Sequence, residues 1–105
     1  RVLFCADGYR YAGKTIDSLA RVREIAAAIP SIERIVVVPN LSAAPDLRGL
    51  ATAETWETFG ARAGRSPALD FAQLPFDHPL YIMYSSGTTG LPKCMVHGAG
   101  GTLLQ

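Results

Sequence analysis

Residues 34–38 read Arg-Ile-Val-Val-Val, and this run with four consecutive β-branched residues decides the predicted fold. β-branched side chains favour extended backbone, and a run without polar alternation is typical of a strand buried on both faces of a parallel sheet. A second apolar run at residues 2–5 predicts another strand upstream. Because helices cover the faces of such a sheet, we expect a helix between the two runs.

The segment between the two runs has the period expected of a helix. From residue 15 to residue 29 apolar residues recur at steps of three and four, a pattern that predicts an amphipathic helix. These residues are Ile16, Leu19, Val22, Ala26 and Ile29. Pro30 ends the helix because it has no backbone N–H to donate. Strand, helix and strand in this order predict the α/β class.

Shorter signals surround this unit. Asp7-Gly8 predicts a tight turn after the first strand, with a positive φ at the glycine. Residues 39–50 contain prolines and a glycine and are expected to be irregular. Residues 55–59 predict one helical turn that Trp56 and Phe59 anchor, and residues 60–67 predict a surface loop. We expect Tyr9, Tyr11 and both cysteines to be packed or buried.

Two further strands are predicted near the end of the chain. Residues 80–84 form an apolar run, and Pro79 before it suits the first position of a strand because it cannot pair. Residues 94–97 form the next apolar run. The segment 98–101 is rich in glycine and should end that strand before another element begins at Thr102.

Length and composition exclude several classes of protein. The chain has 105 residues, 49% of them hydrophobic, which is one domain at most and too apolar for a disordered protein. It contains no apolar run long enough to span a membrane. A net charge of +1 provides no field for nucleic acid or for an acidic membrane surface, so we expect neither partner. Cys5 and Cys94 form no metal-binding spacing, and a reducing cytoplasm is the expected location.

The two ends of the sequence suggest an incomplete domain. Arg1 leads directly into a strand-like segment, and Gln105 closes a segment that has the composition of a helix start. We therefore expect residues 1–105 to be part of a larger protein.

Chemistry is concentrated between the last two predicted strands. Residues 85–93 read Ser-Ser-Gly-Thr-Thr-Gly-Leu-Pro-Lys. Hydroxyl groups donate hydrogen bonds to phosphate oxygens, and glycines let backbone N–H groups approach an anion. From His78 to Gln105 there is no Asp or Glu, so no local carboxylate repels a polyphosphate. The composition alone is equally compatible with a solvated loop, but its density of donors between two apolar strands favours a phosphate-binding loop.

Two common nucleotide motifs do not match this loop. A Walker A motif requires Gly before Lys and Ser or Thr after it, whereas Pro92 and Cys94 flank Lys93. A dinucleotide fingerprint requires a third glycine where Leu103 stands after Gly98 and Gly100. The loop therefore belongs to another class of phosphate-binding segment.

Tyr-Ser-Ser-Gly-Thr-Thr-Gly-Leu-Pro-Lys, followed by Met-Val-His and spanning residues 84–97, resembles the phosphate-binding signature of the adenylate-forming enzymes, the acyl-CoA synthetase superfamily. The flanks, including residues 3–14 and 75–93, are most similar to its acetoacetate–CoA ligase branch and less similar to the acetate-activating branch. The similarity is weak over residues 39–72. Cys94 departs from the family, which usually has Ala or Gly at this position.

The resemblance implies a partial AMP-binding domain, the incomplete large N-terminal domain of an adenylate-forming enzyme. The implied reaction joins acetoacetate to CoA through an acyl-adenylate, with ATP converted to AMP and pyrophosphate. The implied contacts to the ATP phosphates are Ser85, Ser86, Gly87, Thr88, Thr89, Gly90 and Lys93. It implies no catalytic residue within these residues, places the Mg²⁺ ligand and the C-terminal domain elsewhere, and predicts that the chain alone is inactive.

Alternatives remain open at this point. His97 is a candidate for the substrate pocket, although a structural role is the commoner one for a histidine in a strand. The acid could be acetate, propionate or an amino acid instead of acetoacetate. A non-catalytic nucleotide-binding module is the alternative from a different functional class.

Overall fold

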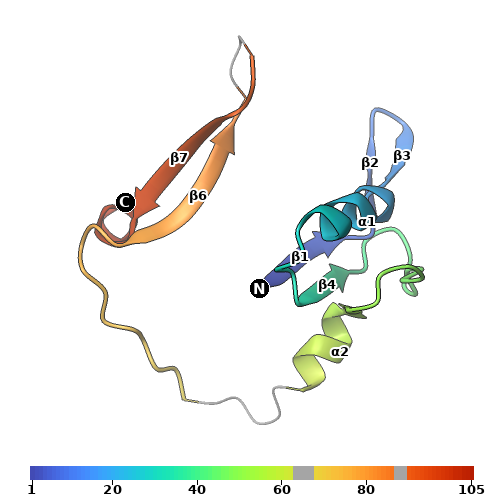
Figure 1. The fold of residues 1–105 in the computed structure, drawn as a ribbon, viewed down its shortest axis with the longest axis horizontal. Helices are drawn as coiled ribbons and strands as arrows, with labels where there is room; N and C mark the ends of the chain where they lie inside the picture. Colours follow the sequence, from blue (N-terminus) through green and yellow to red (C-terminus); the bar gives the residue numbers. More distant parts are fainter. Residues whose placement is uncertain (63–67, 87–89) are drawn as a thin grey trace. The chain divides into compact units, whose positions relative to one another are not determined.

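The computed structural model describes residues 1–62, 68–86 and 90–105. The chain divides into two compact units, Arg1–Pro67 and Ala68–Gln105. Figure 1 shows the ribbon of both units, and each is described here by itself.

The first unit contains the predicted parallel sheet. Strands β1 (Val2–Ala6), β4 (Arg34–Val38) and β5 (Ala53–Thr55) lie in the order β1-β4-β5. β4 pairs in parallel with β1 on one side and with β5 on the other. The helix α1 (Leu19–Ala28) lies between β1 and β4 in the sequence, so the predicted strand-helix-strand unit is confirmed (Figure 1).

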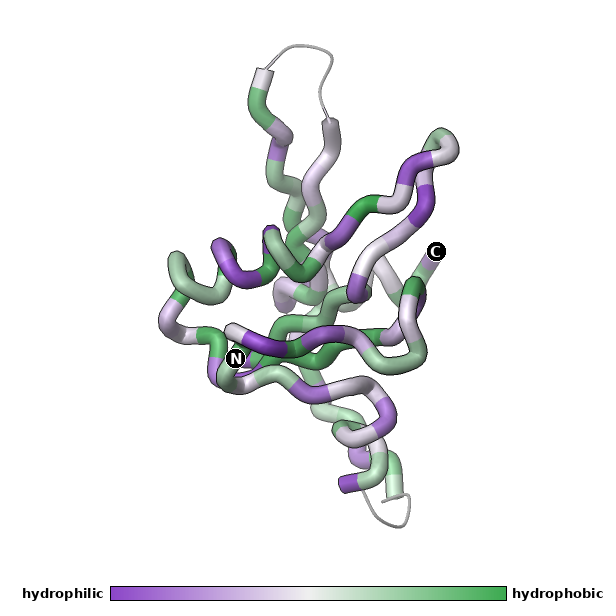
Figure 2. The backbone as a smooth tube through the Cα atoms, turned by 90° about the vertical axis from the view of Figure 1, so that its right-hand side faces the viewer, coloured by the Kyte–Doolittle hydropathy of each residue, from purple (hydrophilic) through white to green (hydrophobic). Residues whose placement is uncertain are grey.

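The central strand β4 supplies the core on both of its faces. Ile35 and Val37 are buried in a cluster with Leu19 and Val22 of α1 and with Leu50. Val36 points to the other face and is 0% exposed. Because successive residues of a strand alternate between faces, burial of all three requires cover on both sides of the sheet. Figure 2 shows how hydrophilic and hydrophobic residues are distributed along the chain.

A hairpin replaces the start of the predicted helix. Strands β2 (Gly8–Tyr11) and β3 (Lys14–Asp17) pair antiparallel, so the prediction of a helix from residue 15 is wrong at its first turn. Ala12 and Gly13 have φ values of 48° and 74°, the left-handed conformation that a two-residue hairpin turn requires. The helix instead begins after Asp17, whose carboxylate accepts a hydrogen bond from the N–H of Leu19 at 2.8 Å.

Gly8 is required for a reason other than the predicted one. The first strand ends before Asp7, where the chain bends as expected. Gly8 belongs to β2 and does not have a positive φ, so that part of the prediction is wrong. A Cβ at this position would collide with the backbone carbonyl of Ile16 and with the side chain of Leu41. The hairpin also carries Tyr9 and Tyr11, which are exposed and do not pack over the sheet as expected.

The end of the first unit contains one short strand that the sequence did not predict and one helix that it did. β5 has only three residues, too few for a pattern of alternation. The helix α2 (Trp56–Ala61) confirms the predicted helical turn and extends it into the predicted loop. Its N-terminus is capped by Thr55, which accepts a hydrogen bond from the N–H of Thr58 at 3.3 Å. Residues 63–67 of the predicted loop lie outside the described residues.

Three aromatic rings cover part of the sheet face on the side of Phe4. The ring centroids of Trp56 and Phe59 lie 6.1 Å and 5.8 Å from that of Phe4, in edge-on arrangements. These contacts connect α2 to β1 and confirm Trp56 and Phe59 as its packing residues.

The second unit is a hairpin followed by a short helix. β6 (Pro79–Ser85) pairs antiparallel with β7 (Lys93–Gly98), and α3 (Ala99–Leu103) follows at once. Both predicted strands are confirmed, with Pro79 at the first position of β6 as expected.

The last helix begins three residues before the predicted position. Its N-terminal N–H groups have partners, because Ala99 donates to the carbonyl of His78 at 2.8 Å and Gly100 donates to that of Phe76 at 2.8 Å. Gly100 lies against the ring of Phe76, where a Cβ would collide. Glycine here permits close packing. The strand ends at Gly98 as expected, but Gly100 and Gly101 belong to the helix.

None of the helices in the described ranges is long and apolar enough to cross a membrane.

Candidate phosphate-binding site

The β6–β7 hairpin brings the two ends of the predicted phosphate loop together. Ser85, the last residue of β6, is the register partner of Lys93, the first residue of β7. Ser85 is half-buried, while Ser86, Gly90 and Lys93 are exposed. Gly87, Thr88 and Thr89, the other predicted contacts, lie outside the described residues. The structure thus places the lysine beside a serine hydroxyl where the paired strands end.

Gly90 has a backbone conformation that other residues adopt only with strain. Its φ is +100°, and no atom lies within 4 Å of the position that a Cβ would occupy. The requirement for glycine is therefore conformational and does not come from crowding. This agrees with the prediction that the loop glycines allow positive φ.

The register of the hairpin divides its side chains between two faces. Paired residues of antiparallel strands point to the same side, and successive residues alternate. One face carries the pairs Ser85 with Lys93, Met83 with Met95, and Tyr81 with His97. The other face carries the pairs Tyr84 with Cys94 and Ile82 with Val96. We call the first of these the lysine face.

Three of the predicted site residues, Ser85, Lys93 and His97, therefore share one surface. Lys93 and His97 are four positions apart in β7, which places them about 13 Å apart along the strand at 3.3 Å per residue. The period of two in a strand could have predicted that Lys93 and His97 share a face. The Met83–Met95 pair lies between them.

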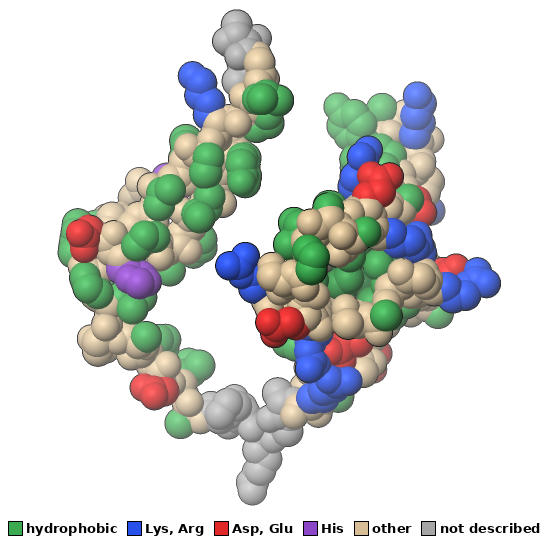
Figure 3. Space-filling model, in the orientation of Figure 1, with side chains coloured by type: hydrophobic (Ala, Val, Ile, Leu, Met, Phe, Trp, Pro, Cys, Tyr) green, Lys and Arg blue, Asp and Glu red, His purple; other side chains and the backbone are tan. Residues whose placement is uncertain are grey.

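The electrostatics of the lysine face are simple. Lys93 is the only Asp, Glu, Lys or Arg residue between His78 and Gln105. Among the ion pairs of the described residues, none involves this lysine. Figure 3 shows hydrophobic side chains along the hairpin and one basic side chain beside its grey tip. An exposed lysine without a competing carboxylate is suited to binding a polyanion.

The two cysteines differ from each other. Cys94 is exposed on the face opposite Lys93, so the expectation that it is buried is wrong. The reason is its position in a two-stranded sheet, which leaves that face uncovered within the second unit as described. Cys5 is half-buried in β1, and burial together with the charge of Asp7 raises the pKa of its thiol.

A buried carboxylate in the first unit, that of Asp7, has a structural role that the sequence did not predict. Asp7 follows β1 and accepts hydrogen bonds from the N–H groups of Asn40, Leu41 and Ser42 at 2.7, 2.9 and 2.9 Å. Burial opposes the charge, but the N–H groups outweigh it, so the pKa of Asp7 is lower than usual. Asp7 thus fastens the segment after β4 to the end of β1. The sequence predicted only bonds within its own turn.

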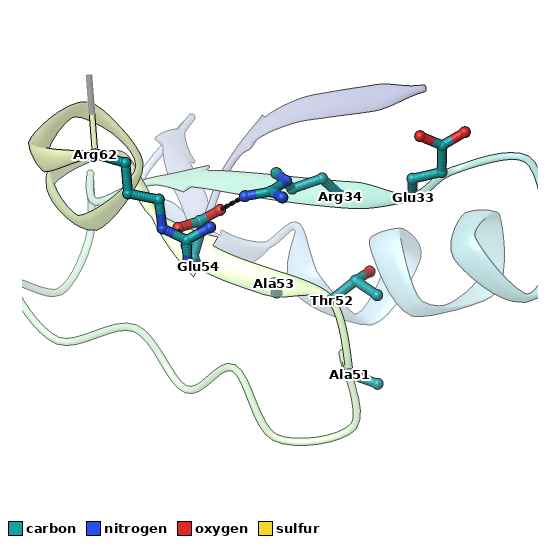
Figure 4. A pocket seen from close by; sticks show the side chains of 7 residues that line it. All are labelled: Glu33, Arg34, Ala51, Thr52, Ala53, Glu54 and Arg62. Carbon is teal, nitrogen blue, oxygen red and sulfur yellow. Dashed lines mark hydrogen bonds and ion pairs between the residues drawn. The ribbon is translucent and has the colours of Figure 1, made fainter.

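A hollow of about 270 Å³ lies at the edge of the same sheet (Figure 4). The carboxylate of Glu54, 11% exposed, lies 3.0 Å from Arg34 Nη1 and 3.2 Å from Arg62 Nη2. The contact with Arg62 has the distance of an ion pair but not the angles of a hydrogen bond, which leaves Glu54 Oε2 without a hydrogen-bond partner. Both guanidinium groups are directed at the carboxylate, so we interpret the cluster as a structural connection between β4, β5 and the end of α2.

In the part of the chain that the structure describes, no group of three or more His, Cys, Asp or Glu side chains could hold a metal ion.

Comparison with known proteins identifies the family. The sequence matches the family described as AMP-binding enzyme over residues 1–105. The acetoacetyl-CoA synthetase of Gallus gallus is 41% identical over 109 residues, covering 100% of this chain and 16% of the relative. The malonamoyl-CoA synthetase vrtB of Penicillium aethiopicum is 43% identical over 110 residues, covering 100% of this chain and 15% of the relative.

A solved structure is also similar to this chain. Acetoacetyl-CoA synthetase from Streptomyces lividans is similar with a TM-score of 0.73 and 41% identity, over 98% of this chain and 15% of that one. The chain therefore spans about one sixth of the length of the curated relatives it matches. These findings confirm the family resemblance and the α/β class. The chain belongs to the AMP-binding enzyme family.

Proposed function

We propose that this chain is part of an ATP-dependent acid–CoA ligase that converts acetoacetate, ATP and CoA into acetoacetyl-CoA, AMP and pyrophosphate. The observation that carries the proposal is 41% identity to an acetoacetyl-CoA synthetase along the full chain. The TM-score of 0.73 to a solved acetoacetyl-CoA synthetase supports it. In this proposal residues 1–105 are part of the AMP-binding domain.

The β6–β7 hairpin holds the β- and γ-phosphates of ATP in the proposed reaction. The contacts are the hydroxyl groups, the backbone N–H groups and the ammonium group of Ser85, Ser86, Gly87, Thr88, Thr89, Gly90 and Lys93. The pairing of Ser85 with Lys93 and the positive φ of Gly90 support this assignment. His97 lies on the same face and lines the substrate pocket.

These residues position the phosphates and stabilise charge. A carboxylate oxygen of the acid forms a bond to the α-phosphorus, and the bond from that phosphorus to the bridging oxygen breaks. The negative charge of the departing pyrophosphate grows in this step, and a fixed ammonium group stabilises it. None of the loop residues has to act as nucleophile or base, and CoA then displaces AMP from the adenylate.

Mg²⁺ is expected with ATP, but its carboxylate ligands do not come from this part of the chain. No Asp or Glu lies between His78 and Gln105. The hard oxygen ligands that Mg²⁺ prefers are therefore limited here to hydroxyl and carbonyl groups. We place the carboxylate ligand of the ion outside residues 78–105 and derive no step through the metal.

The acid is a short one with a carbonyl group on its third carbon. An acetoacetyl group carries a ketone there and a malonamoyl group carries an amide carbonyl, and the chain is 41% and 43% identical to synthetases named for these groups. Acetate and propionate lack this oxygen and are the alternative substrates.

Two free cysteines, one of them exposed, agree with a reducing cytoplasm.

Acid-dependent exchange of pyrophosphate into ATP tests the proposed role of the hairpin. In the full-length enzyme, Lys93→Ala should slow the exchange about tenfold or more, equivalent to about 1.4 kcal/mol of lost transition-state stabilisation. Lys14→Ala is the matched control, because Lys14 lies in the β2–β3 hairpin of the other unit. An unchanged exchange rate in Lys93→Ala would contradict the assignment.

A further inference from the structure

The lysine face of the hairpin ends in a pair of polar rings. Tyr81 is the register partner of His97, and both side chains are exposed. Directly opposite residues have Cβ atoms about 5 Å apart, so the phenol and the imidazole can reach the same small group. Both rings can donate a hydrogen bond. On the lysine face, the pair between this one and Lys93 has no such donors, because Met83 and Met95 are apolar.

The lysine face therefore changes in character along its length. A cation and a serine hydroxyl lie at the loop end, a thioether pair follows, and the two donors lie about 13 Å from the lysine at 3.3 Å per residue. This order fits the substrates of the proposed reaction. The terminal phosphates bind at the loop, the acid is joined to the α-phosphorus, and the far end of a short acyl group then lies farthest from Lys93.

We propose that Tyr81, with His97 opposite it, donates a hydrogen bond to the carbonyl oxygen on the third carbon of the acid and selects acids that carry this oxygen. The inference rests on the proposed function. A site built to hydrogen-bond a polar group rejects an analogue that lacks it, because the donor is then left without a partner. Tyr81 is in this proposal a specificity-determining residue that contacts the substrate.

The opposite face of the hairpin provides a matched control. Tyr84 is three positions from Tyr81, pairs with Cys94 and is 72% exposed, against 51% for Tyr81. Because Tyr84 points to the other side, removal of its hydroxyl should not affect the acid.

The test compares acetoacetate with butyrate in the full-length enzyme, since butyrate has the same carbon chain without the ketone oxygen. In Tyr81→Phe we expect kcat/KM for acetoacetate to fall about tenfold, as for the loss of one hydrogen bond. The value for butyrate should stay the same or rise, since that acid makes no such bond and the variant leaves no phenol O–H without a partner. Tyr84→Phe should leave both values unchanged. The ratio of the two acids is measured within each variant, so it does not depend on how much of the variant is folded.

Two results would overturn the inference. If Tyr81→Phe lowers kcat/KM for both acids by the same factor, or changes neither value, the tyrosine does not recognise the ketone oxygen. This outcome leaves the proposed function standing, provided that the wild-type enzyme forms AMP with acetoacetate. If the wild-type enzyme does not activate acetoacetate at all, the proposed function and the inference both fail.

Discussion

At the residue scale, a few residues have roles that the structure explains directly. Gly90 adopts a φ of +100° at the phosphate loop, and Gly100 leaves room for the ring of Phe76. Asp7 is buried and accepts backbone N–H bonds from residues 33 to 35 positions away. Such a carboxylate stabilises the fold only while it is charged, so its contribution depends on pH.

Asp7→Asn should destabilise the first unit. An amide can accept through one oxygen only, so part of the set of bonds from Asn40, Leu41 and Ser42 is lost. Loss of charge-assisted hydrogen bonds at a buried site costs about 1–3 kcal/mol. Urea unfolding of the full-length protein, followed through a probe in this unit, measures the change.

The pH dependence of this effect follows from the direction of the shift. The folded-state pKa of Asp7 is lowered, so its stabilisation is fully present above the unfolded-state pKa and is lost as the pH falls through the folded-state pKa. The difference in unfolding free energy between wild type and Asp7→Asn should therefore be constant near neutral pH and shrink in acid. A difference that grows as the pH falls would show that the carboxylate is not held in its charged form.

At the scale of elements, the sequence predicted best where one pattern had one explanation. The run in β4 and the two strands of the β6–β7 hairpin were predicted because apolar residues in these lengths fit buried strands. The predicted start of the helix at residue 15 was wrong because Ile16 fits the helical period equally well. The turn that places Ile16 in β3 depends on Ala12 at a φ of 48°. Alanine carries no signal for that conformation.

The candidate site shows the same division. The loop was recognisable because its hydroxyl, glycine and lysine residues are contiguous in the sequence. The alternation within β7 could have predicted that Lys93 and His97 share a face. Their partners in β6 depend on the cross-strand register, which no local pattern specifies. The contacts of Asp7 with residues 40–42 and of Glu54 with Arg34 join segments 20 or more positions apart in the chain, so no sequence spacing could have predicted them.

The ion cluster around Glu54 leads to a prediction at this scale. Glu54→Gln removes the charge that faces Arg34 and Arg62 and leaves two guanidinium groups beside a neutral amide. Glu54 is largely buried although both arginines are partly exposed, so the substitution should lower the free energy of unfolding by about 1–3 kcal/mol.

Glu24→Gln is the matched substitution at a solvent-exposed pair, because Glu24 lies 3.0 Å from Arg21 with both side chains mostly exposed. It should cost less than about 0.5 kcal/mol. Chemical denaturation of the full-length protein compares the two variants. Equal losses in both would show that the burial of Glu54 contributes nothing.

At the scale of the whole molecule, the two units differ in how many of their large apolar side chains are buried. The first is a covered parallel sheet, and its buried hydrophobic residues belong to β4, α1 and the segment at Leu50. The second exposes most of its large apolar side chains, among them Tyr81, Ile82, Met83, Tyr84 and Val96. It also contains residues 85–93, the segment that we propose binds the phosphates of ATP. The chain spans about one sixth of its curated relatives, so the activity must be measured on the full-length enzyme.

The central claim is that the β6–β7 hairpin binds the terminal phosphates of ATP. Calorimetric titration of the full-length enzyme with ATP and with AMP tests it most directly, because AMP lacks those phosphates. The claim predicts that Lys93→Ala weakens ATP binding about tenfold, as for the loss of one charged contact, and leaves AMP binding unchanged. Equal weakening of both nucleotides, or of neither, would contradict it.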